Sequence, residues 1–251
     1  MNFFEKFLFY ISVPCCVYCG ERLEITEKAL CKKCKAEYSD QKERSCSLCG
    51  KPLYFCDCPS EYLDSHFIHR HIKVFRYKPS EKSPANELIF KLKRENRRDV
   101  IEFISDELAN SISQSLKIDE NTIFTSVPRR RQAKALYGID HAEKLAKSVS
   151  KKFNSEYKSL LKSKAKTAQK KAESTEKRIE NAKFKLIDEN LDLSGKTVII
   201  IDDIVTTGAS IGAAAFNIKA LGPKKIIGAS IAITYKDTYK PFSKEDRFFK
   251  K

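Results

Sequence analysis

Two acidic residues followed by small and hydroxyl-bearing residues form the stretch of this chain best suited to chemistry. Asp202 and Asp203 end an apolar run, and beyond Ile204 come Val205, Thr206, Thr207, Gly208, Ala209 and Ser210. Backbone N–H groups at a helix start bind phosphate, hydroxyl side chains add donors, and glycine permits close approach of the anion. Carboxylates repel phosphate but accept hydrogen bonds from sugar hydroxyls. The stretch therefore predicts a site for a phosphorylated sugar.

The elements that must position this stretch are a strand, a turn, a helix and a second strand. Residues 198–201 are apolar on both alternating faces, as in a central parallel strand covered by helices. Apolar residues then recur at helical spacing until Gly222 and Pro223, and another apolar run extends from Ile226 to Thr234. The plainer interpretation is a buried strand that ends in two solvated acids. The complete stretch from Val198 to Ser210 argues against this plainer interpretation, whereas either acid alone would be weak evidence.

A second ligand-facing loop is predicted earlier in the chain. Strands are expected at Ile72 to Tyr77 and at Thr122 to Val127, with a helix between them that carries an apolar face from Val100 to Ile112. Ligands of open α/β sheets bind beyond the carboxyl ends of the strands. The loop after the second strand is therefore expected to face phosphate through Val127, Pro128, Arg129 and Arg130. The alternative for these arginines is a solvated loop face.

Nine cysteines lie before residue 59. Two CxxC pairs have the spacing of a zinc ribbon, in which four thiolates surround a tetrahedral metal; they are Cys16, Cys19, Cys31 and Cys34. Cys15 is a surplus neighbour that could replace Cys16. Disulfides are the alternative, but nothing in the sequence suggests export to an oxidising compartment. We expect a structural rather than a catalytic Zn²⁺.

A second cysteine set repeats this arrangement with a shorter loop and a contracted CxC in place of the second CxxC. Its members are Cys46, Cys49, Cys56 and Cys58. The set predicts a second structural Zn²⁺. The contraction could instead leave one ligand position to His66 or His69, although these histidines are also expected in the linker and first strand of the next domain.

The chain resembles a known family at these motifs. Val198 to Ser210 resembles the signature of type I phosphoribosyltransferases, which bind 5-phosphoribosyl-1-pyrophosphate (PRPP). With the cysteine-rich start, the whole chain is similar to the ComF family of competence proteins. Weaker matches are Leu92-Lys93, Ser126 to Arg129, Gly138, Thr167 to Gln169, Arg178 to Asn181 and Phe184. The resemblance implies an α/β fold: a mostly parallel sheet with flanking helices, preceded by a small zinc-ribbon module.

The resemblance also implies roles for the site residues. Asp202 and Asp203 would be the catalytic acids that hold ribose and Mg²⁺, the turn from Val205 to Ser210 would bind PRPP phosphate, and Val127 to Arg130 would face pyrophosphate. One run departs from the family, which usually carries Arg-Gly-Phe-Asn-Gln where this chain has Tyr137 to His141. This run lacks the positive charge and the amide of the family pattern. The loss argues against pyrophosphate chemistry more than against ribose-phosphate binding. The neighbouring arginines could supply the missing charge.

The formal net charge of +15 is concentrated in residues 151–185, which hold twelve Lys or Arg against four Glu. This composition predicts a mobile basic loop, and the family resemblance implies that it closes over the bound ligand. A polybasic loop can equally bind a nucleic-acid backbone. Candidate DNA-binding residues in it are Lys162, Lys164, Lys166, Lys170 and Lys171.

The charge balance favours a polyanionic partner, and aromatic residues near the ribbon suit stacking on single-stranded DNA. They are Tyr54, Phe55, Tyr62 and Phe67; filling small hydrophobic cores is their alternative role. The resemblance implies natural transformation, in which single-stranded DNA enters the cytoplasm. DNA-translocation machinery at the inner membrane would then be a further partner.

The expected organisation has three parts: an N-terminal helix and zinc-ribbon module over 1–65, a phosphoribosyltransferase-like domain over 66–240, and a basic tail over 241–251. Met1 to Val13 is apolar but too short to span a bilayer, and two charges interrupt it. A short helix packed on the body is expected there, with a membrane-surface anchor as the alternative. We expect a cytoplasmic protein without a transmembrane segment, with a peripheral position at the inner membrane kept open.

Two functions from different classes fit these observations. The first is a competence protein that handles single-stranded DNA and also binds PRPP. The second is an active phosphoribosyltransferase acting on a nucleobase or another nucleophile. The sequence shows no segment dedicated to recognising an acceptor base, because the zinc module occupies the place before the sheet. The first function is therefore favoured.

Overall fold

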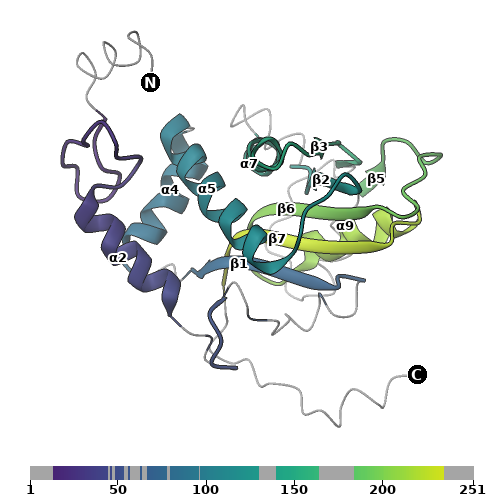
Figure 1. Cartoon of the computed structure of the whole chain (residues 1–251), viewed down its shortest axis with the longest axis horizontal. Helices are drawn as coiled ribbons and strands as arrows, with labels where there is room; N and C mark the ends of the chain where they lie inside the picture. The colour runs from purple at the N-terminus through teal and green to yellow at the C-terminus, as the bar shows by residue number, and fades with distance from the viewer. Residues whose placement is uncertain are drawn as a thin grey trace, which may run out of the picture.

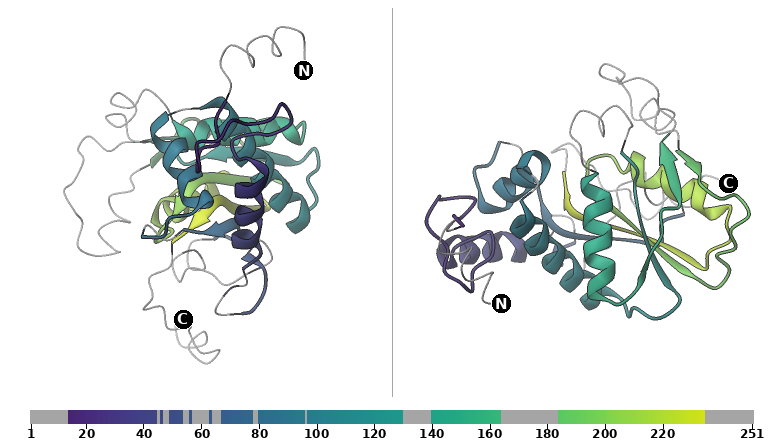
Figure 2. Two further views of the ribbon diagram at one scale, coloured as in Figure 1. Left: turned by 90° about the vertical axis from the view of Figure 1, so that its left-hand side faces the viewer. Right: turned by 90° about the horizontal axis from the view of Figure 1, so that it is seen from above.

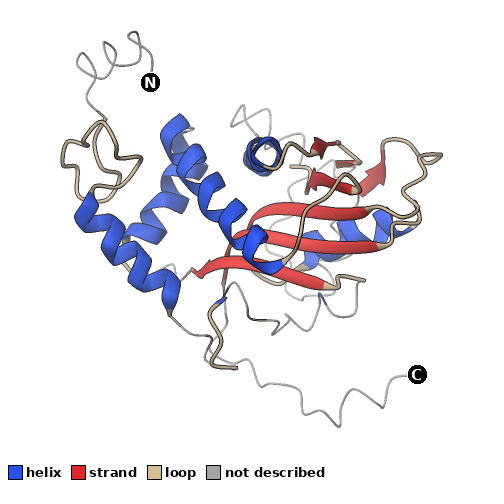
Figure 3. Ribbon diagram, in the orientation of Figure 1, coloured by secondary structure: helices blue, strands red, loops and turns tan. Residues whose placement is uncertain are grey.

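A parallel sheet with helices on both faces forms the body of the protein (Figures 1 and 3). The computed structural model describes residues 14–44, 46, 49–53, 56, 63, 67–77, 80–95, 97–129, 140–163 and 184–234. The expected N-terminal helix and the basic tail lie outside the described residues. No helix in the described part of the chain is long and apolar enough to cross a bilayer.

The main sheet has five strands in the order β1-β7-β6-β2-β3, and every neighbouring pair is parallel. The strands are β1 (Arg70–Arg76), β2 (Thr122–Ser126), β3 (Glu156–Tyr157), β6 (Thr197–Val205) and β7 (Lys225–Ile233). The mostly parallel sheet predicted from the sequence is therefore confirmed. The strands expected near residues 72, 122, 198 and 226 all form, with their ends shifted by a few residues.

The middle of the sheet is apolar on both faces. Val198 to Ile201 are fully buried, and alternate members of this run belong to different hydrophobic clusters. Ile199 and Ile201 pack with the helices of one face, whereas Val198 and Ile200 pack with those of the other. This two-sided burial explains why the run is β-branched throughout rather than alternating with polar residues.

Helices cover the two faces unequally. α5 (Arg98–Ser115) and α7 (His141–Lys152) contact each other and pack on one face, and α9 (Ala209–Lys219) packs on the opposite face (Figure 2). A small antiparallel ribbon, made of β4 (Leu161–Ser163) and β5 (Phe184–Leu186), joins the α9 side of the sheet. The connections from β2 to β3 and from β6 to β7 thus run on opposite faces.

The cysteine-containing segment shares the core of the main sheet. It contributes α2 (Lys32–Glu43), which contacts both α4 (Pro84–Glu95) and β1. Buried Tyr38 packs edge-on against Phe75 of β1 and Phe103 of α5, with ring centroids 5.9 and 5.4 Å apart. Cys16, Cys31 and Cys34 belong to the same buried cluster as these rings. The part of the segment with the first cysteine set and α2 is therefore an extension of the main core, whereas Cys46, Leu53 and Cys56 form a small cluster of their own.

The predicted basic loop is shorter than residues 151–185. Its first thirteen residues complete α7 and form β3 and β4, and its last two residues begin β5. Leu160 and Leu161 are buried, which gives this part of the segment the apolar anchor that a mobile loop lacks. Residues 164–183, which connect β4 to β5, lie outside the described residues.

A buried histidine couples the stability of the sheet to pH. His71 of β1 lies with its Nε2 3.0 Å from the Ser230 hydroxyl of β7, and burial together with the Lys73 charge lowers the pKa of His71 to about 3. Gly228 makes room for the ring, because a Cβ there would lie 3.2 Å from His71 Cδ2. The folded protein therefore holds His71 neutral under conditions in which the unfolded chain protonates it.

We predict that His71→Gln reduces the acid sensitivity of the fold. The pKa of His71 is lower in the folded than in the unfolded state, so the stability present above about pH 6.5 is lost as the pH falls. This loss reaches about 2 kcal/mol near pH 5. Urea unfolding at about pH 7.5 and pH 5 measures it. The variant should start less stable but lose about 2 kcal/mol less between the two pH values; an equal loss in both proteins would contradict the assignment.

Candidate functional site

The crevice between the carboxyl ends of β2 and β6 is the place where the fold favours a ligand. The chain leaves β6 through α9 toward β7 and leaves β2 through α7 toward β3, so the two connections diverge. Such a topological switch point leaves a gap between two loops at the carboxyl edge of a parallel sheet. The two loops are those that the sequence predicted, after Val205 and after Ser126.

β6 extends past the end of β2, and the two acids lie in this extension. β2 pairs with β6 as far as Ser126 opposite Ile201, whereas β6 stays paired with β7 up to Val205. Beyond Ile201, the Asp203 N–H donates to Asp202 Oδ1 (2.9 Å) instead of to a neighbouring strand. The Ile204 N–H donates to Asp203 Oδ1 (2.7 Å). The two acids therefore lie within β6, and their carboxylates accept hydrogen bonds from its backbone.

The site concentrates negative charge. Burial, and then the charge of Asp203, raise the pKa of the Asp202 carboxyl well above its usual range. Lys93 of α4 offsets part of this charge, because its Nζ lies 3.6 Å from Asp203 Oδ2. Adjacent half-buried carboxylates are costly without a partner. Hydrogen-bond donors such as sugar hydroxyls, or a divalent cation, would lower this cost, so these residues fit ribose and Mg²⁺.

Lys93 was not among the predicted site residues. The only signal in the sequence was the Leu92-Lys93 pair, which matched the family pattern without indicating a role. Leu92 is buried, and α4 directs Lys93 toward the crevice. A residue more than a hundred positions from Asp203 can be assigned to the site only from the tertiary structure.

The turn after β6 has the form expected of an anion-binding helix start. Gly208 has a left-handed backbone (φ 79°) that glycine adopts without strain, and no side chain caps α9 at this position. Thr206 and Ser210 are exposed, and the Thr207 hydroxyl accepts a hydrogen bond from Ala209 N–H (3.4 Å). The side chains of Val205 and Ala209 are buried, so these two residues can serve a ligand only through their backbone. The turn therefore offers hydroxyls and helix-start N–H groups together.

The loop after β2 is held by the start of α7. The Arg129 N–H donates to Asp140 Oδ2 (3.0 Å), and Arg129 Nη1 lies 3.2 Å from His141 Nδ1. Burial and the Arg129 charge lower the pKa of His141, whereas the charge of Asp203 acts in the opposite direction. His141 is therefore close enough to both Arg129 and Asp203 to be influenced by their charges. Val127 is buried and Pro128 is half-buried, and Arg130 lies outside the described residues.

The departure from the family pattern has a structural role in this chain. Asp140 is the N-cap of α7, where its Oδ1 accepts a hydrogen bond from Glu143 N–H (3.2 Å) while its Oδ2 binds the β2 loop. Both carboxylate oxygens are therefore engaged by backbone donors. A carboxylate in place of the usual amide joins the loop to the helix. Tyr137 to Ile139 lie outside the described residues.

The first cysteine set converges as predicted. The sulfurs of Cys16, Cys19, Cys31 and Cys34 lie within 4.8 Å of one another, and Cys19 Sγ is 3.6 Å from Cys31 Sγ. Burial tends to raise the pKa of Cys16, but backbone N–H groups outweigh it and lower this pKa to about 7. Cys15, the alternative ligand, is exposed and pairs with Arg22 in a β-bridge. Four convergent thiols fit a tetrahedral Zn²⁺, and Cys16 rather than Cys15 belongs to the set.

The second cysteine set repeats the backbone of the first. In the first set, Cys16 N–H donates to Glu21 O, and Gly20 N–H donates to Cys16 O. In the second set, Cys46 N–H donates to Lys51 O, and Gly50 N–H donates to Cys46 O. Three sulfurs converge within 4.8 Å; they belong to Cys46, Cys49 and Cys56. Cys58 and His66 lie outside the described residues. His69 is not in the cluster and contacts the Ile226 backbone through Nδ1 (3.2 Å).

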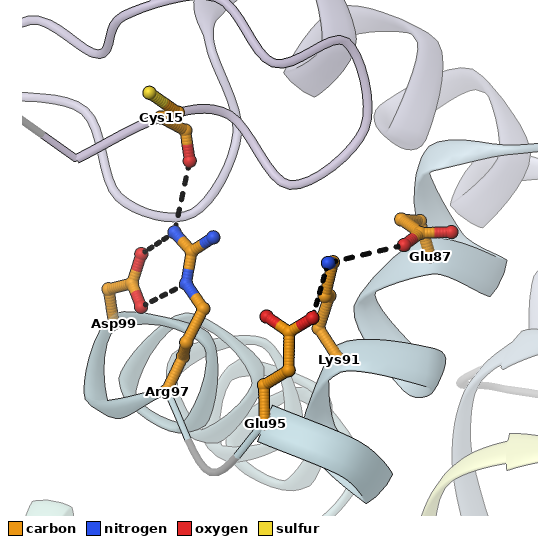
Figure 4. Close-up of polar contacts among 6 residues, drawn as sticks. All are labelled: Cys15, Glu87, Lys91, Glu95, Arg97 and Asp99. Carbon is orange, nitrogen blue, oxygen red and sulfur yellow. Dashed lines mark hydrogen bonds and ion pairs between the residues drawn. The ribbon is translucent and has the colours of Figure 1, made fainter.

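Direct contacts tie both cysteine sets to the sheet domain. Arg97, the N-cap of α5, binds Asp99 with two hydrogen bonds and donates to the Cys15 carbonyl (3.0 Å), as Figure 4 shows. The buried Lys73 of β1 donates to the Cys56 carbonyl (2.7 Å). Metal binding at the cysteines would therefore stabilise backbone segments that contact β1 and α5.

Of the candidate DNA-binding lysines, the structure describes only Lys162. It is exposed on β4, on the α9 side of the sheet, and the other four lie outside the described residues. A small cavity of about 140 Å³ opens elsewhere, between the cysteine segment and the sheet. Its lining consists of Gln41, Arg44, Leu53, Arg76, Glu81, Ser83 and Ala85. The ion pair between Arg44 and Glu81 crosses this junction, which is separate from the β6 turn.

We predict that Cys31→Ser with Cys34→Ser removes one bound Zn²⁺ per chain and lowers the melting temperature. The double variant loses two thiolates of one tetrahedral site, and metal-binding energy contributes directly to folding in such sites. Metal analysis of the purified protein together with thermal unfolding measures both effects. Cys15→Ser is the matched control, because its sulfur is outside the cluster, and it should keep the full metal content. Unchanged zinc in the double variant would reject the site.

The comparison with solved structures finds purine phosphoribosyltransferases. Adenine phosphoribosyltransferase from Thermoanaerobacter pseudethanolicus is 16% identical, with 56% of this chain and 83% of that chain covered and a TM-score of 0.36. Hypoxanthine phosphoribosyltransferase from Staphylococcus aureus is 14% identical, with coverage of 55% and 73% and a TM-score of 0.35. Adenine phosphoribosyltransferase from Saccharomyces cerevisiae is 14% identical, with coverage of 70% and 90% and a TM-score of 0.35.

A family model gives the stronger result. Comparison with curated proteins gives no significant match. The model of the phosphoribosyl transferase domain matches residues 100–250, which is more than half of the chain. The match includes both acids, the turn after them and the loop after β2, and the sheet extends beyond it to include β1. This chain therefore belongs to the phosphoribosyl transferase domain family.

Proposed function

We propose that this protein is a competence protein of the ComF type, which binds PRPP at the switch point and handles single-stranded DNA in the cytoplasm during natural transformation. The observation that carries the first part is the convergence of three elements at one crevice. They are the Asp202–Asp203 pair with Lys93, the glycine turn before α9, and the loop of Arg129. Membership of the phosphoribosyl transferase domain family supports PRPP as the ligand.

PRPP fits this site by its chemistry. Its ribose hydroxyls can donate to Asp202 and Asp203, and its 5-phosphate matches the N–H and hydroxyl donors from Thr206 to Ser210. Mg²⁺ carried by the pyrophosphate would offset the remaining negative charge of the two acids. Val127, Pro128, Arg129 and Arg130 are assigned to the pyrophosphate side. The His141 contact places Arg129 at the start of α7, on the side of the crevice that β2 supplies.

The cysteine sets are proposed to hold two structural Zn²⁺ ions, with Cys58 completing the second. The repeated hydrogen-bond pattern around Cys16 and Cys46 supports the same metal at both sites. In this arrangement zinc has no open coordination position and no catalytic step. Its contribution is to fix the segment that packs against α4 and α5.

Single-stranded DNA is the proposed macromolecular partner. The net charge of +15 favours a polyanion, and residues 151–185 carry a large excess of lysine. The lysines from 164 to 171 would contact phosphates from the loop that connects β4 to β5. DNA-translocation machinery at the inner membrane is the proposed source of the strand, with the protein cytoplasmic or peripheral to that membrane.

An active phosphoribosyltransferase is the second candidate function, and the family membership is compatible with it as well as with the first. The acids and the phosphate turn would hold PRPP while a nucleobase or another nucleophile displaces pyrophosphate. Arg129 and Mg²⁺ would stabilise the departing charge. The described part of the segment before the sheet packs against α4 and, through Tyr38, against Phe103 of α5. Pyrophosphate release in the presence of candidate bases would establish this function.

We predict that Asp202→Asn with Asp203→Asn weakens Mg²⁺–PRPP binding by about 100-fold or more, because each carboxylate loses a charged hydrogen bond to ribose. The melting temperature at neutral pH should stay equal or rise. The folded state raises the pKa of Asp202, so ionisation of this group costs stability at neutral pH, and the amide removes that cost.

Calorimetric titration and thermal unfolding measure the two effects. Asp188→Asn with Glu189→Gln is the matched control, because it changes the charge equally at two exposed positions after β5. The control should bind Mg²⁺–PRPP as the wild type does. Undiminished binding by the Asp202 and Asp203 double variant would overturn the assignment of the site.

We also expect Mg²⁺–PRPP binding to change when a single-stranded oligonucleotide is already bound, because both ligands would use the loop between β4 and β5. Calorimetric titration of the zinc-loaded protein, with and without oligo(dT), measures this change. If the oligonucleotide leaves Mg²⁺–PRPP binding unchanged, the two ligands bind at separate sites. A search for an acceptor of the phosphoribosyl group would then follow. If PRPP binds in neither titration, the turn after β6 keeps the form of a PRPP site without binding PRPP.

A further inference from the structure

An aromatic pair is exposed on the α9 side of the sheet. Phe216 is 63% exposed on a helix whose neighbouring positions are mostly buried, and Phe67 is 40% exposed just before β1. The two ring centroids lie 6.5 Å apart with a tilt of 35°. Lys219, one helical turn after Phe216, places its Nζ 3.2 Å from the centre of the Phe67 ring. Two rings and a cation thus share one patch of surface.

The backbone at Phe67 is held in an unfavourable conformation. Its φ of 64° is left-handed, a region that bulky residues rarely adopt because of backbone strain. Burial does not account for this strain, because the side chain remains substantially exposed. The conformation brings the ring next to Phe216. Strain of this kind is concentrated at functional positions.

Positive charge lies on the same side of the sheet. Lys162 and Lys185 are exposed and directly opposite each other in the β4–β5 ribbon, which packs beside α9. Like charges in this cross-strand position are unfavourable, and a bound polyanion would offset them. Three further exposed lysines lie in the chain at the end of α9 and just after it; they are Lys219, Lys224 and Lys225.

We propose that Phe67 and Phe216 form a stacking platform for the bases of single-stranded nucleic acid, with Lys162, Lys185 and Lys219 binding its backbone. This inference rests on the proposed function, since the partner is the single strand assigned there, and it adds the surface that receives the bases. An apolar protein segment would match the two rings but not the opposed lysines. Aromatic faces combined with a basic track are the usual arrangement for sequence-independent single-strand binding.

The platform is separate from the phosphate turn. Phe216 is seven residues after the start of α9 at Ala209, or about 10 Å along the helix. The ribbon with Lys162 and Lys185 leads directly into the connection between β4 and β5. A single strand bound at Phe216 would therefore lie about two helical turns from the phosphate turn.

The chain has no tryptophan, so Phe216→Trp introduces a single fluorescent reporter at the platform. Titration with oligo(dT) should quench this tryptophan, because a stacked base contacts the indole face. An abasic oligonucleotide of equal length keeps the phosphates but lacks the bases, and it should bind without comparable quenching. Equal quenching by both oligonucleotides, or none by oligo(dT) while it binds, would overturn the platform.

Affinity measurements provide a second test with a matched control. Phe216→Leu keeps an apolar side chain but removes the ring, and it should weaken oligo(dT) binding about five-fold or more. Phe90→Leu is the control, because Phe90 is 42% exposed with Arg94 over its ring but lies on α4, which contacts α2 and α5. This control should leave the affinity unchanged. Equal affinities of Phe216→Leu and the wild type would overturn the proposal.

The outcomes separate this inference from the proposed function. If the wild type does not bind oligo(dT), the proposed DNA-handling function fails and the platform fails with it. If the wild type binds and Phe216→Leu binds equally well, only the platform fails. Self-association that depends on Phe216, measured by light scattering without nucleic acid, would instead assign the patch to a second copy of the chain and overturn the platform.

Discussion

The difference in length between β6 and β2 is the constraint on which the candidate site depends. Because β2 ends opposite Ile201, the last residues of β6 have a neighbouring strand on one side only. The carboxylates of Asp202 and Asp203 bind the N–H groups of Asp203 and Ile204 in this extension. The same shortening of β2 leaves the acids next to the loop that follows β2, at the switch point of the sheet.

The cysteine segment helps to position the site although its cysteines lie outside it. Lys93 reaches Asp203 from α4, and α4 packs between α2 and α5 in a core that includes Cys31 and Cys34. Arg97 fixes the start of α5 to the Cys15 carbonyl. The direction of the Lys93 side chain therefore depends on packing that metal binding would stabilise. Zinc held by these cysteines would therefore influence ligand binding through packing, without taking part in chemistry.

Two buried basic side chains of β1 have hydrogen-bond partners, whereas the lysines of the α9 side are exposed. His71 is neutral beside Ser230, and Lys73 donates to the Cys56 carbonyl. The exposed lysines of the β4–β5 ribbon and the end of α9 face solvent. The protein thus has an acidic crevice at the carboxyl edge of its sheet and a basic, aromatic surface over α9. The two regions suit ligands of different chemistry.

The sequence alone determined the elements with strong local patterns. The β-branched run before Asp202, the helical spacing after Gly208 and the CxxC pairs each depend on residues close in the chain, so periodicity and spacing sufficed. Only the tertiary structure placed Lys93 at Asp203, showed that the acids lie within β6, and gave Asp140 its capping role. It also selected Cys16 over Cys15, since adjacent residues in an extended backbone point to opposite sides. These decisions depend on contacts between distant segments, which local patterns do not specify.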